Sequence, residues 1–515
     1  MEELAMRRFH WASGALALMS LAAGLQALGC FPLDYTERDH GVTPGSGSAG
    51  GEAPREPRCV PGLQEGPDAS CGIFVSVEAG PRGDGSKERP FNTLAAAIDA
   101  AAGREPDQRR IYACVGTFME KVVLSADGIE VYGSLACDQE WRLAEEDRRT
   151  TLGAGPDEIP LTIVGGGGST RLEGLEVVAR PAARPGGSSI AVVAEKVKLE
   201  LVRCTLQAGD AKHGESSDNY EMDAQPGRVG GDGAPACSAL SGAGGISDPL
   251  ECDEDVTVGG IGGQGAPATA GQGNPGSPEG ATNTGGIGQR AAAFCSVGGP
   301  GGRGQDGAPG EGGVGLGQIT RSGYKGVDGA NGARGRPGEG GGGGGASRGR
   351  FEAARCPAMG PTSGAGGGAG GTGGCGGLGG RGGQAGGSSI ALISLASELR
   401  FQEVTLVAGK GGNGGAGQHG QIGGAGAEGG KGGDAPDGLQ DGCAGGMGGH
   451  GGAGGDGGGG TGGHSLAIAF KGMPVPPSEG QGFTAELGEP GAGGPGFQGR
   501  DGATGNRAIA LGFDE

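Results

Sequence analysis

The sequence predicts an all-β protein: a parallel β-helix (a solenoid) with a short N-terminal capping helix and glycine-rich insertions that are polyproline II-like or disordered. Short apolar stretches separated by glycine-containing turns follow one another over residues 71–209, without a helix of crossover length between them. One of these stretches recurs 200 positions later, as expected for coils of one solenoid. The remaining tracts carry Gly at every third position, which is the period of polyproline II.

The composition excludes several ordinary classes of protein. Gly supplies 131 of 515 residues, whereas its usual share is about 7%. Aromatic residues make up 4% and apolar residues 34%, too little for the roughly three packed domains that the length suggests, so an ordinary α/β enzyme is disfavoured. The net charge of -20, from 59 acidic and 39 basic residues, argues against a nucleic-acid partner, because phosphate binding needs clustered positive charge.

The N-terminus has the features of an export signal. Residues 1–29 predict a signal peptide, because Arg7 and Arg8 precede an uncharged apolar stretch from Trp11 to Leu28. An uncleaved membrane anchor is the alternative, although the stretch is close to the lower length limit for a span. Residues 30–57 lack periodicity and predict a disordered tether.

The sequence Leu25-Gln26-Ala27-Leu28-Gly29-Cys30 resembles a bacterial lipobox. The resemblance implies that Cys30 is lipidated and that the protein binds a membrane through this anchor. Phe31 in place of Asp implies delivery to the outer membrane. Ala27 and Leu28 depart from the usual motif, so cleavage without lipidation stays open.

Residues 58–209 carry the signals of the β-helix. A short helix is expected over residues 93–101, because Leu94, Ala97, Ile98 and Ala101 are spaced for one face, with Thr93 or Asn92 as its cap. The strands expected from Val, Ile and Leu content are 73–77, 111–115, 122–124, 129–132, 161–164, 172–178, 190–193 and 197–206.

The segment Gly83–Leu94, with Pro90-Phe91-Asn92-Thr93-Leu94, resembles the opening motif of right-handed β-helices of the pectin-lyase-like superfamily. Residues 116–122 and 128–133 resemble the coils that follow in that superfamily. The resemblance covers about residues 71–210. It implies a right-handed coil whose apolar end is covered by the helix, as the terminal units of solenoids require.

The solenoid is expected to continue after long insertions. Gly186–Ala191 recurs as Gly386–Ala391, and Thr205-Leu206 recurs as Thr405-Leu406. We therefore expect a glycine-rich insertion over 210–385, a further coil over 386–409, a glycine triplet tract over 410–463, and terminal strands with a glycine-rich tail over 464–515. Separate small domains are the alternative.

The glycine tracts allow two states. The triplets run from Gly411 to Gly432 and from Gly442 to Gly463, and such spacing places every third Gly along one edge of a polyproline II helix. Edges without Cβ atoms permit a hydrogen-bonded polyglycine II bundle, whereas the entropy lost by ordering Gly favours a solvated brush. The tracts resemble the glycine-rich repeat proteins of the PE-PGRS type in composition and period, without the helical PE module of that family. The broken, Pro-poor runs disfavour a collagen helix.

Twelve cysteines, with Cys30 lipidated, leave eleven, and export favours disulfides. The preferred local pairs are Cys59 with Cys71 and Cys114 with Cys137. Three further pairs are expected to clasp the insertions: Cys237 with Cys252, Cys295 with Cys356, and Cys375 with Cys443. Spacing cannot fix the connectivity. Cys204 is expected to remain a buried thiol.

No catalytic residue, metal site or cofactor is assigned from the sequence. Ser347 satisfies a GxSxG pattern that chance explains in a glycine tract. Glu251, Asp253 and Asp255 are a weak Ca²⁺ candidate, and a solvated acidic loop is the preferred interpretation. The superfamily places catalytic acids, or an Arg or Lys base, on the outer face of one sheet. The residues available there are Arg171, Glu173, Glu176, Glu200 and Arg203.

These observations favour an exported, lipid-anchored outer-membrane lipoprotein, at the cell surface or on the periplasmic face, with a structural or adhesive role. Polysaccharide or other surface proteins are its expected partners. A non-enzymatic role is favoured, and the alternative is a polysaccharide lyase or glycoside hydrolase of the β-helix type.

Overall fold

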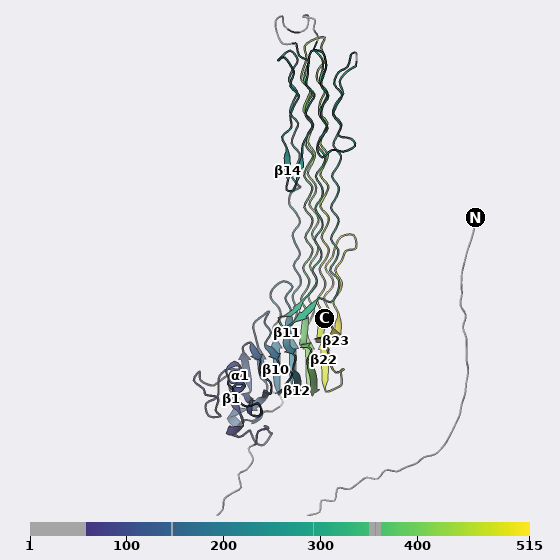
Figure 1. Ribbon diagram of the computed structural model, residues 1–515. Helices are drawn as coiled ribbons and strands as arrows, with labels where there is room; N and C mark the ends of the chain where they lie inside the picture. The colour runs from purple at the N-terminus through teal and green to yellow at the C-terminus, as the bar shows by residue number, and fades with distance from the viewer. Residues whose placement is uncertain (1–57, 146–147, 292, 350–355, 357–361, 515) are drawn as a thin grey trace, which may run out of the picture. The chain divides into compact units, whose positions relative to one another are not determined.

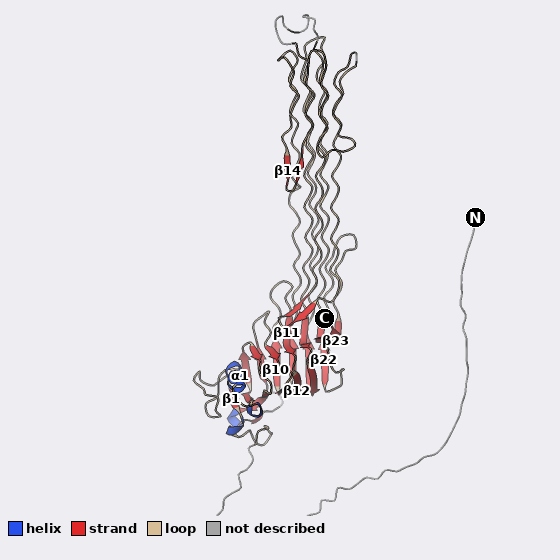
Figure 2. Ribbon diagram, in the orientation of Figure 1, coloured by secondary structure: helices blue, strands red, loops and turns tan. Residues whose placement is uncertain are grey.

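The strands of the protein form three parallel β-sheets, which the chain enters in a repeating order. The structure is a computed structural model that describes residues 58–145, 148–291, 293–349, 356 and 362–514. With few exceptions, each successive strand of these sheets joins the next sheet, so that neighbouring strands of one sheet come from successive passes of the chain (Figures 1 and 2). Helical residues are few, and the fold is mostly β with parallel pairing. The proposed signal peptide, the lipidation site at Cys30 and the tether lie outside the described residues.

The strands are assigned to the sheets as follows. Sheet A contains β1 (Ile73–Val75), β2 (Arg110–Cys114), β5 (Glu130–Ala136), β9 (Ser169–Glu173), β12 (Lys198–Val202) and β19 (Glu398–Gln402), with β6 (Arg142–Leu143) antiparallel to β5. Sheet B contains β3 (Gly116–Met119), β7 (Thr150–Gly153), β10 (Leu175–Ala179), β13 (Thr205–Ala208), β20 (Val404–Ala408) and β22 (Phe483–Leu487). Sheet C contains β4 (Val122–Leu124), β8 (Leu161–Val164), β11 (Ser189–Glu195), β18 (Ser389–Leu395), β21 (Ser465–Lys471) and β23 (Arg507–Gly512).

One hydrophobic core is shared by the three sheets. Leu199 from sheet A, Leu206 from sheet B and Val192 from sheet C are all buried in it. The helix α1 (Leu94–Ala102) contributes Leu94, Ala97, Ile98 and Ala101 to the same core and packs against β1, β2 and β4. Short 3-10 helices occupy Ala69–Cys71, Pro106–Gln108 and Cys137–Gln139.

The start of α1 is fixed by two side chains. Thr93 Oγ1 accepts a hydrogen bond from the Ala96 N–H at 3.3 Å, as an N-cap should. Glu120 reaches the same helix end, where its carboxylate accepts from the N–H groups of Leu94 at 2.7 Å and Ala95 at 3.1 Å. A carboxylate at this end also complements the helix dipole.

Two corners between the sheets are tight. Residues with positive φ stand between sheets A and B, at Arg203 (49°) and Glu403 (55°). Others stand between sheets C and A, at Lys196 (51°) and Ala396 (51°). A left-handed residue turns the chain sharply, so the next strand begins within a few residues.

The long insertions all lie at the third corner, where the chain passes from sheet B to sheet C. They follow β13, β20 and β22 and return at β18, β21 and β23. The strands on either side remain in register across them, because Ser189 pairs with Ser389 and Thr205 pairs with Thr405.

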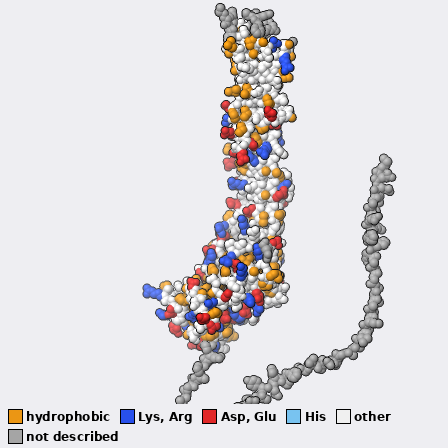
Figure 3. All heavy atoms as spheres, viewed as in Figure 1, with side chains coloured by type: hydrophobic (Ala, Val, Ile, Leu, Met, Phe, Trp, Pro, Cys, Tyr) orange, Lys and Arg blue, Asp and Glu red, His pale blue; other side chains and the backbone are white. Residues whose placement is uncertain are grey.

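The inserted glycine-rich segments run side by side as a bundle (Figure 1). We call this the glycine bundle, and its segments are 210–236, 242–249, 258–265, 270–277, 283–289, 296–313, 326–349, 362–388, 409–434, 442–464 and 488–506. White spheres, which are backbone and uncharged polar groups, cover much of its visible face (Figure 3).

Hydrogen bonds inside the glycine bundle have a period of three. The Gly329 N–H donates to the Gly383 carbonyl at 2.9 Å, and the bond recurs at every third residue as far as Gly344 and Gly368. The closeness requires glycine: a Cβ on Gly377 would overlap the carbonyl oxygen of Gln421. Of the two states that the sequence left open, the structure shows the hydrogen-bonded one.

Two antiparallel hairpins interrupt the bundle segments. Hairpin β14 (Leu250–Cys252) and β15 (Asp255–Thr257) lies beside residues 373–375. Hairpin β16 (Gln318–Thr320) and β17 (Gly323–Lys325) covers the outer face of sheet C, where Ile319 packs with Ile190, Ile390 and Leu466.

The strand expectations were largely right in place and less so in extent. The ranges 122–124 and 161–164 coincide with β4 and β8. The ranges 172–178 and 197–206 each divide into two strands, because the left-handed residues Gly174 and Arg203 carry the chain from sheet A to sheet B. Strands β3 and β7 were not expected, since each is four residues long and contains Gly and Thr beside few apolar residues.

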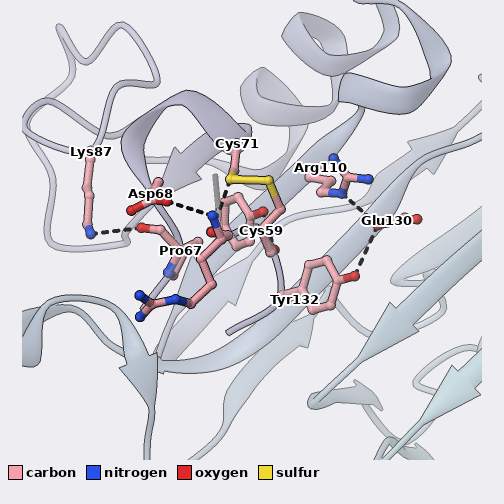
Figure 4. The surroundings of a disulfide bond; sticks show 10 residues. Cys59, Pro67, Asp68, Cys71, Lys87, Arg110, Glu130 and Tyr132 are labelled. Atoms are coloured by element: carbon pink, nitrogen blue, oxygen red, sulfur yellow. Dashed lines mark hydrogen bonds and ion pairs between the residues drawn. A yellow bond between two sulfur atoms is a disulfide. The ribbon is translucent and has the colours of Figure 1, made fainter. Parts of the chain in front are cut away.

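The two local disulfides form as expected. Cys59 pairs with Cys71, and Cys114 pairs with Cys137. The first of them joins Cys59 to the 3-10 helix that ends at Cys71 (Figure 4). The Tyr112 hydroxyl of β2 also donates to the Cys59 carbonyl at 2.6 Å. The chain before Cys71 is also held by Lys87, which donates to the Pro67 carbonyl at 2.9 Å.

The three clasps expected in the insertions were wrong. Cys237 pairs with Cys356, Cys252 with Cys375, and Cys295 with Cys443, instead of 237–252, 295–356 and 375–443. Each observed disulfide joins two parts of the insertions that are 119 to 148 residues apart in sequence. Cys204 is a buried free thiol, as expected.

Candidate functional site

The outer face of sheet A carries a row of alternating charge. The residues are Arg110, Glu130, Arg171, Glu200 and Arg400, one on each of five adjacent strands. Arg110 Nε lies 3.0 Å from Glu130 Oε2, and Arg171 Nη1 lies 2.8 Å from Glu200 Oε1. Opposite charges on neighbouring strands stabilise the pairing of this register.

Two of the five residues that the sequence offered as catalytic candidates, Arg171 and Glu200, belong to this row, and Glu173 and Arg203 are joined to it by ion pairs. Glu173 is 6% exposed and is held by Arg171 at 2.8 Å and by Arg203. Burial alone would lower the pKa of Arg171, but its hydrogen bonds to Glu173 and Glu200 raise that pKa above its ordinary value. Arg171 therefore stays protonated and is unsuited to act as a base.

Glu176, the fifth candidate, belongs to a different face. It lies on β10 in sheet B, where its Oε2 accepts from the Thr151 hydroxyl at 2.7 Å. The structure does not bring it to Glu173 and Glu200. The candidate carboxylates are thus engaged by arginines or a hydroxyl, and the arrangement fits a charge-paired sheet surface better than an acid–base pair.

Glu176 interrupts a row of threonine hydroxyls that was not predicted from the sequence. The row contains Thr117, Thr151, Glu176, Thr205, Thr405 and Thr484, one from each of the six strands of sheet B. On β13 the neighbours Leu206 and Ala208 are buried, which places Thr205 on the outer face. The signal in the sequence was the recurrence of Thr205-Leu206 as Thr405-Leu406.

The structure does not bring the three carboxylates of the weak Ca²⁺ candidate together as a metal site. Asp253 pairs with Arg334, and Asp255 Oδ2 lies 3.5 Å from Arg336 Nη1, so these carboxylates tie hairpin β14–β15 to segment 326–349. Glu251 is an exposed residue of β14 and forms no ion pair with Arg334 or Arg336. Within the described ranges, no group of three or more His, Cys, Asp or Glu side chains could hold a metal ion.

The glycine bundle contains a polar groove of about 1010 Å³ near its junction with the sheets. Its walls are residues 215–222 on one side and Asp328, Gly329 and Asn331 on the other, with residues 381–384 as the floor. Carboxylates outnumber cations in the lining: Glu215, Asp218, Glu221 and Asp328 face a single arginine, Arg381.

Two glutamines hold the first wall away from the floor. Gln418 Oε1 accepts from the Arg381 N–H at 3.0 Å, and its amide group donates to the Asp218 carbonyl. Gln421 likewise accepts from the Leu378 N–H at 3.0 Å and donates to the Met222 carbonyl at 3.0 Å. Before and after this stretch the same two segments are joined by direct backbone hydrogen bonds, such as the one from the Cys375 N–H to the Gln225 carbonyl. The glutamine side chains take the place of such bonds, which separates the segments and opens the groove.

Comparisons with known proteins add little to this geometry. No family model matches the chain, and no curated protein matches it. Among solved structures, pectin methylesterase PemA from Erwinia chrysanthemi shows a weak likeness at 14% identity and a TM-score of 0.14. The likeness covers 29% of this chain and 56% of that protein.

A helix long and apolar enough to cross a membrane is not found in the part of the chain that the structure describes.

Proposed function

We propose that this protein is an exported, lipid-anchored lipoprotein of the bacterial outer membrane with a structural or adhesive role, which contacts polysaccharide through the outer face of sheet B. The five disulfides in the described ranges support export, because such bonds persist in oxidising compartments. Lipidation at Cys30 and a likeness to glycine-rich PE-PGRS-type proteins belong to the same proposal.

We further infer that sheets A, B and C are the faces of a right-handed parallel β-helix. The cyclic order of the strands, the shared core and the two tight corners support this inference. The helix α1 would then cover one end of the coil, in keeping with the pectin-lyase-like motif at residues 83–94.

The row of hydroxyls on sheet B carries the proposal of polysaccharide binding. Adjacent strands lie about 4.8 Å apart, so the row presents a polar group at a regular interval across six strands. A threonine hydroxyl both donates and accepts, which suits the hydroxyl groups of sugars, and its methyl group offers an apolar contact. A flat repeated face of this kind fits a repeating polymer better than a small ligand.

The test uses co-elution of the purified protein, residues 31–515, with a panel of neutral and acidic polysaccharides on size-exclusion chromatography. Thr205→Val and Thr405→Val remove two central hydroxyls and keep the side-chain shape. We expect the double variant to lose co-elution by about fivefold or more in apparent affinity, since each lost hydrogen bond contributes on the order of 1 kcal/mol.

The matched control is Thr269→Val, an exposed threonine that connects two segments of the glycine bundle and is remote from sheet B in sequence. Binding by the wild type and the control, with loss only in the double variant, supports the proposal. Equal binding by the wild type, the control and the double variant would show that sheet B does not bind the polysaccharide. Shortening of the polysaccharide during incubation would favour the alternative of a lyase or hydrolase.

A further inference from the structure

The polar groove is the continuation of a position that other segments fill further along the glycine bundle. In the half distant from the sheets, residues 258–265 lie between segments 326–349 and 362–388. That segment ends at hairpin β14–β15, whose Asp253 pairs with Arg334 and whose Cys252 is bonded to Cys375. Beyond the hairpin the same two neighbours continue as Asp328–Asn331 and Arg381–Gln384, and these residues line the groove.

The filled half shows which bonds this position supplies. Gly367 and Gly370 donate to the carbonyls of Gly263 and Gly260 at 2.9 and 2.8 Å. In return, the N–H groups of Gly260 and Gly263 each donate at 2.8 Å, to the carbonyls of Gly341 and Gly344. The inserted strand thus both accepts and donates at every third residue.

Backbone groups at the same three-residue spacing lie in the groove or next to it, where the hydroxyl of the lining residue Tyr220 donates to the Gly379 carbonyl at 2.8 Å. Counting on from Gly367 and Gly370 in steps of three residues, segment 362–388 reaches Gly379, Gly382 and Ala385. The N–H of Gly379 has no hydrogen-bond partner among the described residues. The N–H groups of Gly382 and Ala385 are capped by Asn331 Oδ1 at 2.8 Å and Asp328 Oδ1 at 2.7 Å. On the other neighbour, equivalent steps from Gly341 lead to the Gly332 and Gly329 carbonyls, to which no N–H of the described chain donates.

We propose that the groove binds an extended, glycine-rich peptide strand with basic residues, in the polyproline II conformation, supplied by another chain. The strand would continue the line of residues 258–265, accept from Gly379 and donate to the carbonyls of Gly332 and Gly329. Glycine is required wherever the strand approaches its neighbours, because a Cβ on Gly262 would overlap the Gly367 carbonyl in the filled half.

The charge of the groove selects the remaining residues of that strand. The side chains of Glu215, Asp218 and Glu221 line the first wall, and within the described chain their carboxylates form no hydrogen bond or ion pair. Lysine or arginine at every third position would place cations along this wall. The stretch 379–385, which contains the floor, corresponds to about 19 Å of a strand that rises about 3.1 Å per residue.

A threefold peptide is the direct probe. Acetyl-(Gly-Gly-Lys)4-amide is titrated into the full protein and followed by isothermal calorimetry, beside a peptide of identical composition whose lysines are not spaced by three. We expect the periodic peptide to bind and the scrambled one to bind at least about fivefold more weakly. Neutralising the wall with Asp218→Asn and Glu221→Gln should weaken the periodic peptide by about fivefold, given the usual strength of exposed ion pairs.

Two further variants separate the groove from general charge. Ser217→Trp places a bulky ring in the groove and should abolish binding, whereas Glu428→Gln removes an exposed carboxylate of the bundle outside the groove and should leave binding unchanged. Equal affinity for both peptides, or unchanged binding to Ser217→Trp, would overturn the proposal. Competition by a neutral oligosaccharide would assign the groove to sugars instead. The double threonine variant of sheet B should bind the peptide normally, so this inference and the polysaccharide proposal fail independently.

Discussion

His464 is a buried titratable side chain whose surroundings oppose its protonation. It is 2% exposed, at the point where the glycine bundle meets β21. Its Nδ1 accepts the Asn506 N–H at 2.8 Å, and its Nε2 lies 2.9 Å from the Leu316 carbonyl, which fixes the neutral tautomer with the proton on Nε2. The rings of Tyr324 and Phe513 pack edge-on against it.

Burial lowers the pKa of His464 below its ordinary value of 6.5. As the pH falls, His464 takes up a proton in the unfolded chain before it does so in the folded protein. The contribution of neutral His464 to the stability of the fold is therefore complete above about pH 6.5 and declines as the pH falls towards the folded pKa. We expect the midpoint of thermal unfolding to fall between pH 7 and pH 5, and His464→Asn to flatten that decline, because its amide oxygen can accept the Asn506 N–H without titrating.

The exposed His450 provides the control for this prediction. His450→Asn should keep the wild-type profile of unfolding midpoint against pH. An unaltered decline in His464→Asn would show that other groups cause the acid sensitivity.

Among the elements, hairpin β16–β17 has a clear structural task. It returns the chain from segment 296–313 to segment 326–349 and, on the way, covers the outer face of sheet C. Ile319 is 3% exposed and contacts a second core that also contains Ile190, Ile390 and Leu466. Arg321 adds an ion pair to Glu195, and its hydrogen bond to that carboxylate lowers the pKa of Glu195.

Ile319→Ala should loosen this hairpin. Removing a buried branched side chain and leaving a cavity costs about 2–4 kcal/mol. We expect a lower midpoint of urea unfolding and faster amide exchange at residues 318–325. Val314→Ala, at a side chain that is 71% exposed, should leave both unchanged. Slow exchange at the hairpin in Ile319→Ala would mean that the ion pair alone holds it.

The sequence was informative where one element carries its own signal. The apolar runs at 122–124 and 161–164 and the helix with its Thr93 cap could be identified because burial and capping are local. The pairing of Cys252 with Cys375 could not, since it depends on which bundle segments become neighbours. The polar groove was equally hidden, because it results from Gln418 and Gln421 replacing backbone bonds over a short stretch.

At the scale of the whole molecule, the glycine bundle differs from the sheets in how its backbone is satisfied. Segment 362–388 lies among several neighbours and donates to each in turn: Gly368 to Cys443, Ala369 to Gly231, and Gly370 to Gly260. Every N–H from Gly366 to Cys375 is bonded in this way. Segment 296–313 lies at the margin, and between Gly304 and Gly313 only every third N–H has a partner in the described chain.

Amide exchange should therefore reveal the bundle by a period that no sheet produces. Amides with a hydrogen-bonded partner exchange only when the structure opens, whereas solvent-facing amides exchange freely. We expect residues 366–375 to retain nearly all their amide protons in deuterated buffer, and residues 304–313 to retain about one in three, at 304, 307, 310 and 313. Mass spectrometry with fragmentation resolves the individual positions. Complete exchange in both segments would establish a solvated brush, and protection at alternate residues would establish strands, so the three states of the glycine tracts are separated by one experiment.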